Sequence, residues 1–301
     1  MNGFCLSGGL NISMKDHIIK ATAEGIRVFA AVTTDLVNEA RERHQCLPVA
    51  TAALGRTLTG ALLLAANLKN NECITLKIEG DGQLGRIVAD ANPEGYVRGY
   101  VDNPQVNLPL ENGKLAVGKA VGKGMVSVTR FTGLKQPFTG SSELVTGEIA
   151  EDLTQYLYTS EQTPSSIGLG VLVDKDLSVM AAGGFFIQAL PNVEEKSLDL
   201  LEQNLKTLSP VSQMIKDGLD AKGIIAKIFE GMTVNYFETT DLQFKCQCSK
   251  EKIQGVLVSL GEKELSSLVD DGQAEVCCHF CGEKYQFDKG ELEALLEEEK
   301  V

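Results

Sequence analysis

The feature that most constrains this chain is a set of paired cysteines in its last quarter. Cys246 and Cys248 form a C-x-C motif, and Cys278 and Cys281 form a C-x-x-C motif. Two such pairs, separated by a short module, are typical of a four-coordinate zinc site, because each pair reaches the metal from one tight turn. The alternative is that they are buried or disulfide-bonded without a metal. Cys277 is an extra neighbouring thiol, but only Cys278 leaves the two-residue loop of a zinc knuckle, so we favour Cys278 as the ligand.

Zinc modules often bind nucleic acid, and the charge of this chain argues against that use. The formal net charge is −13, and the segment from Tyr236 to Val301 carries 15 acidic and 7 basic residues, a balance of 7 − 15 = −8. Phosphate contacts require an excess of Lys and Arg on at least one face. A zinc-ribbon module that binds DNA or RNA is therefore disfavoured, and we expect no nucleic-acid partner.

Two segments bear on the location of the protein, and both favour the cytoplasm. The N-terminal stretch Met1–Gly9 lacks a basic start followed by an unbroken apolar run, so we expect no secretory signal. The longer stretch Pro48–Leu68 has about the length of a membrane span, but Arg56 and Asn67 interrupt it. We predict a buried core helix and no membrane partner. In a reducing cytoplasm, close cysteine pairs indicate metal or redox chemistry rather than a disulfide framework.

Residues 1–191 have the pattern of one α+β domain, a sheet with helices laid on it. Alternating apolar residues and turn signals predict the strands, and three-and-four spacing predicts the helices. The expected strands are Ile26–Val32, Cys73–Glu79, Arg86–Ala89, Tyr96–Val101, Val126–Phe131, Ile167–Val173 and Val179–Leu190, and the expected helices are Asp35–Gln45, Pro48–Leu68 and Ser142–Tyr158.

Residues 192–235 are predicted to form a hinged helical arm. Leu198, Leu201, Leu205 and Leu208 make one apolar stripe on a helix, and Pro210 must end or bend it. Gly218 and Gly223 interrupt the residues after Pro210, so we expect two or three short helices. The stripe either docks on the first domain or binds a partner.

Residues 236–301 form the predicted cysteine module. Ser249 can cap a helix through Leu260, and a second helix is expected over Glu262–Val269. Glu275–Phe287 has the pattern of a hairpin around the second cysteine pair. Asp288 and Glu291 resemble a capping box for a terminal helix whose Leu292, Leu295 and Leu296 need a surface to lie against.

Other candidate motifs carry no convincing chemistry, so we expect no enzymatic activity. Gly80–Gly85 matches G-x-G-x-x-G, but Arg86-Ile-Val-Ala is β-like, which favours a hairpin turn over a dinucleotide site. Gly113–Lys119 is a near match to the P-loop, with Ala120 in place of the required Ser or Thr. His17 and His44 lack the partners of a hydrolase site, and the isolated Cys5, Cys46 and Cys73 are expected to be small buried apolar residues.

The cysteine module is suited to sensing oxidants. Zinc-bound cysteines are thiolates, the form that oxidants attack, and a small module loses its fold when the metal leaves. The adjacent arm would then come loose and expose apolar side chains of the kind that bind unfolding proteins. These candidate client-binding residues are Leu198, Leu201, Leu205, Met214, Ile224, Ile225 and Phe229.

The order of parts, and above all Cys246-x-Cys248 followed by Cys278-x-x-Cys281, resembles the redox-regulated 33 kDa chaperonin family of bacteria over the whole chain. The resemblance implies that these four cysteines bind one zinc ion when reduced. It also implies that they form the disulfides Cys246–Cys248 and Cys278–Cys281 when oxidised. It further implies a cytoplasmic, stress-responsive, ATP-independent holdase for unfolded client proteins that becomes a homodimer once activated. Cys277 departs from the pattern and could exchange as ligand or disulfide partner.

A second interpretation remains open at this point. Cys278-His-Phe-Cys281 has the spacing of a thiol-disulfide oxidoreductase, although that motif normally opens a helix after a strand. The surrounding residues look like a hairpin instead, which disfavours the oxidoreductase.

Overall fold

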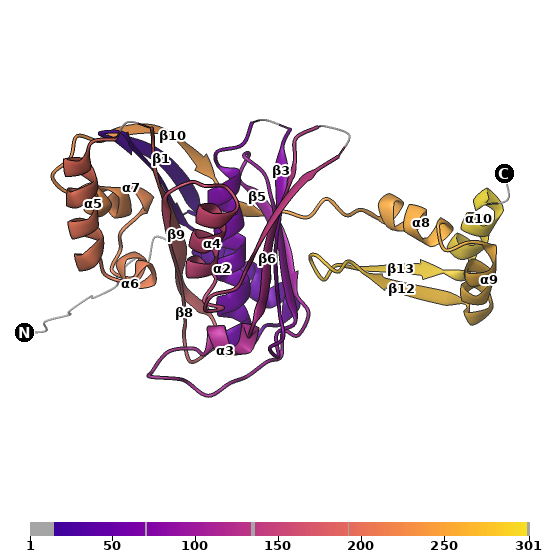
Figure 1. The fold of residues 1–301 in the computed structure, drawn as a ribbon. Helices are drawn as coiled ribbons and strands as arrows, with labels where there is room; N and C mark the ends of the chain where they lie inside the picture. Colours follow the sequence, from indigo (N-terminus) through magenta and orange to yellow (C-terminus); the bar gives the residue numbers. More distant parts are fainter. Residues whose placement is uncertain (1–14, 70, 134–135, 192, 300–301) are drawn as a thin grey trace, which may run out of the picture.

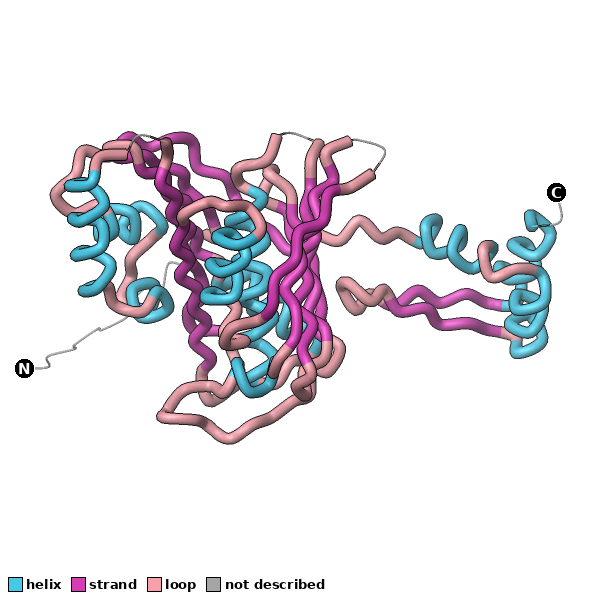
Figure 2. Tube along the Cα trace, viewed as in Figure 1, coloured by secondary structure: helices cyan, strands magenta, loops and turns pink. Residues whose placement is uncertain are grey.

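The computed structural model describes residues 15–69, 71–133, 136–191 and 193–299 (Figure 1). Cys5 and the N-terminal stretch Met1–Gly9 lie outside these residues. Within them, two large β-sheets enclose a layer of helices, further helices cover the outside of one sheet, and a small module extends beyond the other (Figures 1 and 2).

The two large sheets contain eleven of the strands. The five-stranded sheet has the order β10-β1-β2-β9-β8, and the six-stranded sheet has the order β11-β5-β4-β3-β6-β7. The first is built from β1 (His17–Ala23), β2 (Ile26–Val32), β8 (Ser165–Val173), β9 (Val179–Ala189) and β10 (Asn235–Asp241). The second is built from β3 (Cys73–Gly80), β4 (Arg86–Ala91), β5 (Tyr96–Val101), β6 (Gly124–Phe131), β7 (Phe138–Glu143) and β11 (Gln243–Phe244).

Helix α2 (Pro48–Ala65) runs between the sheets and forms the centre of the core. Pro48 occupies the start of the helix, where its missing N–H costs nothing, and the Ala- and Leu-rich sequence compensates for the two glycines Gly55 and Gly60. The helix has the length and composition of a membrane span, yet 89% of it is buried inside the protein. The prediction of a buried core helix is therefore confirmed. Helices α1 (Thr34–His44), α3 (Val117–Val121) and α4 (Ala150–Thr159) complete the layer.

Three short helices form the predicted arm: α5 (Glu195–Thr207), α6 (Val211–Lys216) and α7 (Ala221–Ile228). They lie on the outer face of the five-stranded sheet, where their apolar side chains join a second core with β1, β2 and β9 (Figure 1). Asn204 ties α5 to the end of α7 by donating hydrogen bonds to the carbonyl oxygens of Ile228 and Glu230 at 3.0 and 2.9 Å. The arm is thus docked on the first domain in this state.

The C-terminal module contains α8 (Lys250–Val258), α9 (Glu262–Asp271), the hairpin of β12 (Gln273–Cys277) and β13 (Lys284–Asp288), and α10 (Lys289–Glu299). Ser249 caps α8, and Asp288 and Glu291 exchange the two hydrogen bonds of a capping box, at 2.9 and 3.1 Å. The small core of the module includes Leu265, Phe287 and Leu292. The predicted caps and hairpin are confirmed.

The fold differs from the sequence predictions in the number of sheets, the start of one helix and the place of one glycine. Two sheets form instead of one, because α2 is apolar on every side and needs a sheet on each face. The helix predicted over Ser142–Tyr158 begins only at Ala150, because Ser142 belongs to β7 and buried Asp152 accepts hydrogen bonds from four amides of residues 145–149. Gly223, predicted to interrupt the arm, lies inside α7, where its N–H is capped by Asp220.

The segment that joins the arm to the module was not predicted to belong to the sheets. Strand β10 pairs with β1 at one edge of the five-stranded sheet, and β11 pairs in parallel with β5 at the edge of the six-stranded sheet. The division of the chain into 1–191, 192–235 and 236–301 stays a prediction. The structure adds that residues 235–244 contribute a strand to each sheet before the cysteines begin.

Candidate metal centre

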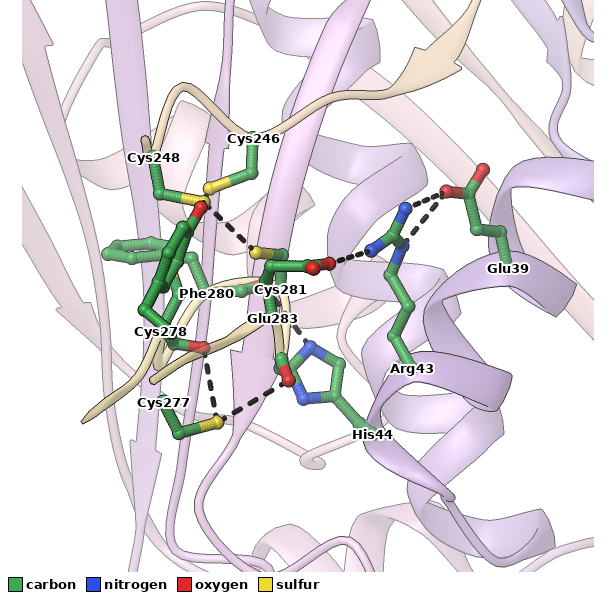
Figure 3. Close-up of polar contacts among 12 residues, drawn as sticks. Glu39, Arg43, His44, Cys246, Cys248, Cys277, Cys278, Phe280, Cys281 and Glu283 are labelled. Carbon is green, nitrogen blue, oxygen red and sulfur yellow. Dashed lines mark hydrogen bonds and ion pairs between the residues drawn. The ribbon is translucent and has the colours of Figure 1, made fainter. Parts of the chain in front are cut away.

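The four paired cysteines converge where the module meets the six-stranded sheet. Cys246 and Cys248 follow β11 directly, and the N–H of Lys245 donates to the carbonyl oxygen of Val97 in β5 at 2.8 Å, which fixes this segment against the sheet. Cys278 and Cys281 lie in the turn between β12 and β13. The sequence therefore brings one pair from a strand end and the other from a hairpin tip to the same point (Figure 3).

The hairpin tip has the backbone of a tight knuckle. The amides of Cys281 and Gly282 donate to the carbonyl oxygen of Cys278 at 3.3 and 2.8 Å, and the amide of Cys278 donates to the carbonyl oxygen of Glu283 at 2.8 Å. Gly282 has a φ of 71°, a left-handed conformation that glycine adopts without the steric cost of a side chain. This geometry turns both sulfur atoms of the hairpin to one side.

The four sulfur atoms fit a tetrahedral metal. The Sγ atoms of Cys246 and Cys278 are 3.8 Å apart, those of Cys248 and Cys281 are 3.4 Å apart, and all four lie within 4.8 Å of one another. A zinc–sulfur distance of about 2.3 Å places the sulfurs of a tetrahedral site roughly 3.8 Å apart. The chemistry of the donors agrees, because an all-thiolate set selects zinc over magnesium or calcium.

The electrostatics of the cluster also favour a bound cation. Burial raises the pKa of Cys246, but hydrogen bonds from the backbone of Cys248 and from Arg98 outweigh it and lower the pKa to about 7. Burial raises the pKa of Cys278 and of Cys281. Four thiolates this close repel one another, so a divalent cation at their centre is what allows all of them to stay deprotonated.

Two side chains donate hydrogen bonds to the sulfur atoms. Nη1 of Arg98, from β5, lies 3.7 Å from Sγ of Cys246. The hydroxyl of Tyr285, from β13, donates to Sγ of Cys248 at 3.1 Å. One donor therefore comes from the first domain and the other from the module itself.

The knuckle packs on the outer face of β5. The guanidinium of Arg98 lies 4.2 Å from the ring centroid of Phe280, and the ring of Tyr100 contacts Phe280 and His279 edge-on at 5.3 and 3.9 Å. Nε2 of His44 lies 2.9 Å from the carbonyl oxygen of Gly99 and 3.2 Å from that of Phe280. His44 therefore joins α1, β5 and the knuckle, in a structural role.

Helix α1 supplies a second cation beside the cluster. Arg43 forms an ion pair with Glu39 at 2.8 Å on its own helix and lies 3.8 Å from Glu283 in the module (Figure 3). The backbone carbonyl of Arg43 also lies so close to Gly282 that an added Cβ there would come within 2.8 Å of it. Glycine at position 282 thus serves both the turn and the contact with α1.

The remaining candidate thiols lie apart from the cluster. Cys277 is exposed at the end of β12, with its Sγ 3.5 Å from the carbonyl oxygen of Gly282. Cys46 is buried in the core, where burial raises its pKa to about 12, and Cys73 is half-buried at the start of β3. The C-x-x-C pair lies in a hairpin turn and not at the start of a helix, a setting that does not fit the oxidoreductase alternative.

The two glycine-rich motifs, at residues 80–85 and 113–119, form turns that connect structural elements. Gly80–Gly85 connects the antiparallel strands β3 and β4, which confirms the hairpin turn. The region of Gly113–Lys119 forms a turn followed by the short α3, which was not predicted.

The candidate client-binding side chains are covered in this state. Leu201, Met214, Ile224, Ile225 and Phe229 are buried, and Leu198 and Leu205 are half-buried against the same cluster. They all belong to the core between the arm and the five-stranded sheet, and the arm lies on the opposite side of the first domain from the β12–β13 hairpin (Figure 1).

Sequence reasoning missed the residues that surround the cysteines, namely Arg98, Tyr100, Arg43 and Tyr285. A signal was present for two of them. Tyr96, Arg98 and Tyr100 alternate on one face of a predicted strand, and an exposed strand face with this composition indicates a contact surface.

Comparison with known proteins agrees with this geometry. Residues 16–288 match the family described as Hsp33 protein. The chain is 50% identical to the 33 kDa chaperonin of Desulforamulus reducens, covering 94% of this chain and 98% of that protein, and 48% identical to the 33 kDa chaperonin of Bacillus subtilis, covering 93% and 98%. The crystal structure of the 33 kDa chaperonin from Thermotoga maritima has a TM-score of 0.88 and 39% identity, covering 94% of this chain and 99% of that one. The chain therefore belongs to the Hsp33 family of 33 kDa chaperonins.

Proposed function

We propose that this protein is a redox-regulated, ATP-independent holdase that oxidation activates to protect unfolding proteins from aggregation. The observation that carries the proposal is the four-cysteine cluster, with all sulfur atoms within 4.8 Å, in a member of the Hsp33 family. The docked arm supplies an apolar surface that is covered in this state. The cytoplasm, whose reducing conditions keep such thiols reduced, is the proposed location.

In the reduced protein, Cys246, Cys248, Cys278 and Cys281 would hold one zinc ion. The metal would supply the positive charge that keeps the four sulfurs deprotonated, and it would join the hairpin to the segment after β11. The module's own core cluster contains five buried side chains, those of Leu257, Leu265, Phe287, Leu292 and Leu295, and so small a core gives the module little stability without this link.

Oxidation by hydrogen peroxide converts each pair of thiolates into a disulfide. One sulfur attacks a peroxide oxygen, the O–O bond breaks, and hydroxide leaves. The neighbouring thiolate then displaces a second hydroxide from the resulting sulfenic acid. Two electrons pass from each cysteine pair to one peroxide molecule. Disulfide sulfurs are poor metal ligands, so the four oxidised cysteines would no longer hold a zinc ion and the module would lose its fold.

We propose that the disulfides are Cys246–Cys248 and Cys278–Cys281. In the reduced state the sulfur contacts of 3.8 and 3.4 Å join one motif to the other. Pairing within each motif nevertheless requires only short loops, which stay closed at little entropic cost once the module is unfolded. Peptide mapping of the oxidised protein without reduction distinguishes the two patterns.

Release of the arm would expose the client-binding side chains Leu198, Leu201, Leu205, Met214, Ile224, Ile225 and Phe229. Partly folded proteins that expose apolar surface are the proposed clients. We propose further that the activated protein is a homodimer, since an exposed apolar surface on one copy can also be covered by another.

One experiment tests the function. Reduced, zinc-loaded protein is treated with peroxide at mildly raised temperature, and zinc release, free thiols and suppression of client aggregation by light scattering are measured on the same samples. We expect loss of zinc and four thiols together with the gain of holdase activity. Equal activity of reduced and oxidised protein would refute the redox control.

A further inference from the structure

We propose that Arg98 is a positioning residue of the cysteine centre, through which the first domain holds the module in place and slows oxidation of Cys246. The inference rests on the proposed function and deepens it, because it assigns control of the oxidation rate to a residue outside the module. Three independent interactions of the same guanidinium support it.

The first interaction is the hydrogen bond to sulfur. Nη1 of Arg98 lies 3.7 Å from Sγ of Cys246. The guanidinium is oriented by Asp90, whose Oδ2 accepts from Nε at 3.0 Å and from Nη2 at 2.9 Å. Asp90 is in turn held by the hydroxyl of Thr75 at 2.6 Å. A chain of three side chains on neighbouring strands therefore aims one N–H group at the thiolate.

The second interaction is electrostatic. Four thiolates around one divalent cation leave two negative charges uncompensated, and the module around them is strongly acidic. Arg98 from β5 and Arg43 from α1 bring two positive charges to the side of the cluster that faces the first domain. Because Arg98 is only 30% exposed, water screens its charge less than that of a surface residue.

The third interaction fixes the position of the knuckle. The guanidinium lies over the ring of Phe280 at 4.2 Å, between the two hairpin cysteines, and Tyr100 packs against the same ring. Arg98 thus contacts both cysteine motifs at once, Cys246 through sulfur and the hairpin through Phe280. Few other side chains could replace it, because this role needs a planar cation with several donors.

These interactions have a chemical consequence. A hydrogen bond to a thiolate stabilises its lone pairs, so the sulfur becomes a weaker nucleophile toward peroxide. Oxidation of Cys246 is therefore slow while the knuckle is docked on β5, and it becomes faster when the module moves away. The first domain in this way sets the oxidant level at which the protein responds.

The test uses the full-length, reduced, zinc-loaded protein. In Arg98→Gln we expect peroxide to release zinc roughly tenfold faster, in line with the effect of removing a hydrogen-bond partner of a metal ligand. Arg98→Lys, which keeps the charge but not the fork of donors, should be intermediate. Cobalt in place of zinc provides a spectroscopic signature, because the sulfur-to-cobalt charge-transfer band should move to lower energy when the N–H donor is lost.

Arg130→Gln is the matched control. Arg130 lies in the same sheet, pairs with the carboxylate of Glu161, and is 35% exposed, close to the exposure of Arg98, but it has no ion pair or hydrogen bond to the described residues of the module. We expect its zinc release and cobalt band to match the wild type. Release from Arg98→Gln within twofold of the wild type, with an unchanged cobalt band, would overturn this inference and leave the proposed function intact. Failure of the wild type itself to lose zinc would instead overturn both.

Discussion

At the scale of single residues, the buried carboxyl of Asp16 makes the stability of the fold depend on pH. It lies just before β1 and accepts hydrogen bonds from the amides of Leu36 at 2.7 Å and Asp35 at 3.3 Å, in the first turn of α1. Burial raises its pKa from 3.8 to about 7, and these hydrogen bonds only partly oppose the shift. As the pH rises, the carboxyl of Asp16 therefore loses its proton in the unfolded chain at a lower pH than in the folded protein. The free energy of unfolding consequently falls between about pH 4 and pH 7 and levels off above that range.

Replacing Asp16 by Asn should remove this dependence. The variant loses one acceptor at every pH, but it avoids the cost of burying a charge above neutral pH. Relative to the wild type, its free energy of unfolding should rise by about 2 kcal/mol between pH 5.5 and pH 8. Urea unfolding at the two pH values measures this, and a difference that does not change with pH would contradict the assignment.

At the scale of elements, α6 and α7 both pack on the five-stranded sheet, and α7 contributes the most deeply buried side chains of the docked arm. Ile224 is fully buried between this helix and the five-stranded sheet. Ile224→Ala should cost about 3 kcal/mol of local stability. Faster hydrogen exchange over α5–α7, and holdase activity before any oxidation, are the expected results. Lys227→Ala, on the exposed side of the same helix, is the control and should change neither. If the faster hydrogen exchange of Ile224→Ala were confined to the module, Ile224 would not be one of the residues that hold the arm on the sheet.

Elements with strong local patterns could be predicted from the sequence. Strand β2, helix α2, an arm of two or three short helices and the β12–β13 hairpin were all expected, as was the grouping of four cysteines in one module. Elements defined by long-range pairing could not be predicted. Strand β1 depends on its partners β2 and β10, and β11 has only two residues. Likewise Asp152 delays the start of the predicted helix through hydrogen bonds to a loop that no periodicity reveals.

The same division applies to the site. The cysteines can be recognised from the sequence, because the ligands of a zinc site come in pairs that lie close together along the chain. Arg98, Arg43 and His44 reach the knuckle from more than a hundred residues away in sequence, and only the paired strands and α1 bring them there. The number and position of sulfur atoms could be predicted, whereas the cations and hydrogen-bond donors around them could not.

At the scale of the whole molecule, the core around α2 and the small core of the module predict two separate unfolding events. The core around α2 is large and extends far beyond the cysteines, whereas the module has a small core of its own. Chelation of the metal from the reduced protein should therefore unfold α8–α10 and leave the two large sheets intact, apart from the short edge strand β11. Limited proteolysis should then cut within residues 249–299 and spare a fragment that ends near residue 245. Simultaneous loss of the entire fold would contradict this independence.

The strands β10 and β11 determine the order in which a disturbance can travel from the cysteines to the arm. The module and the arm lie at opposite ends of the molecule, and residues 235–244 are the covalent route between them (Figure 1). Strand β11 pairs with β5 through two residues, so it opens with little free energy once the module is gone. Strand β10 has seven residues and pairs with β1 on both sides of a β-bulge, so its separation from β1 requires more thermal energy than the opening of β11. We therefore expect two thresholds in series, a chemical one at the sulfur atoms and a thermal one at β10, so that exposure of the arm requires both oxidation and raised temperature.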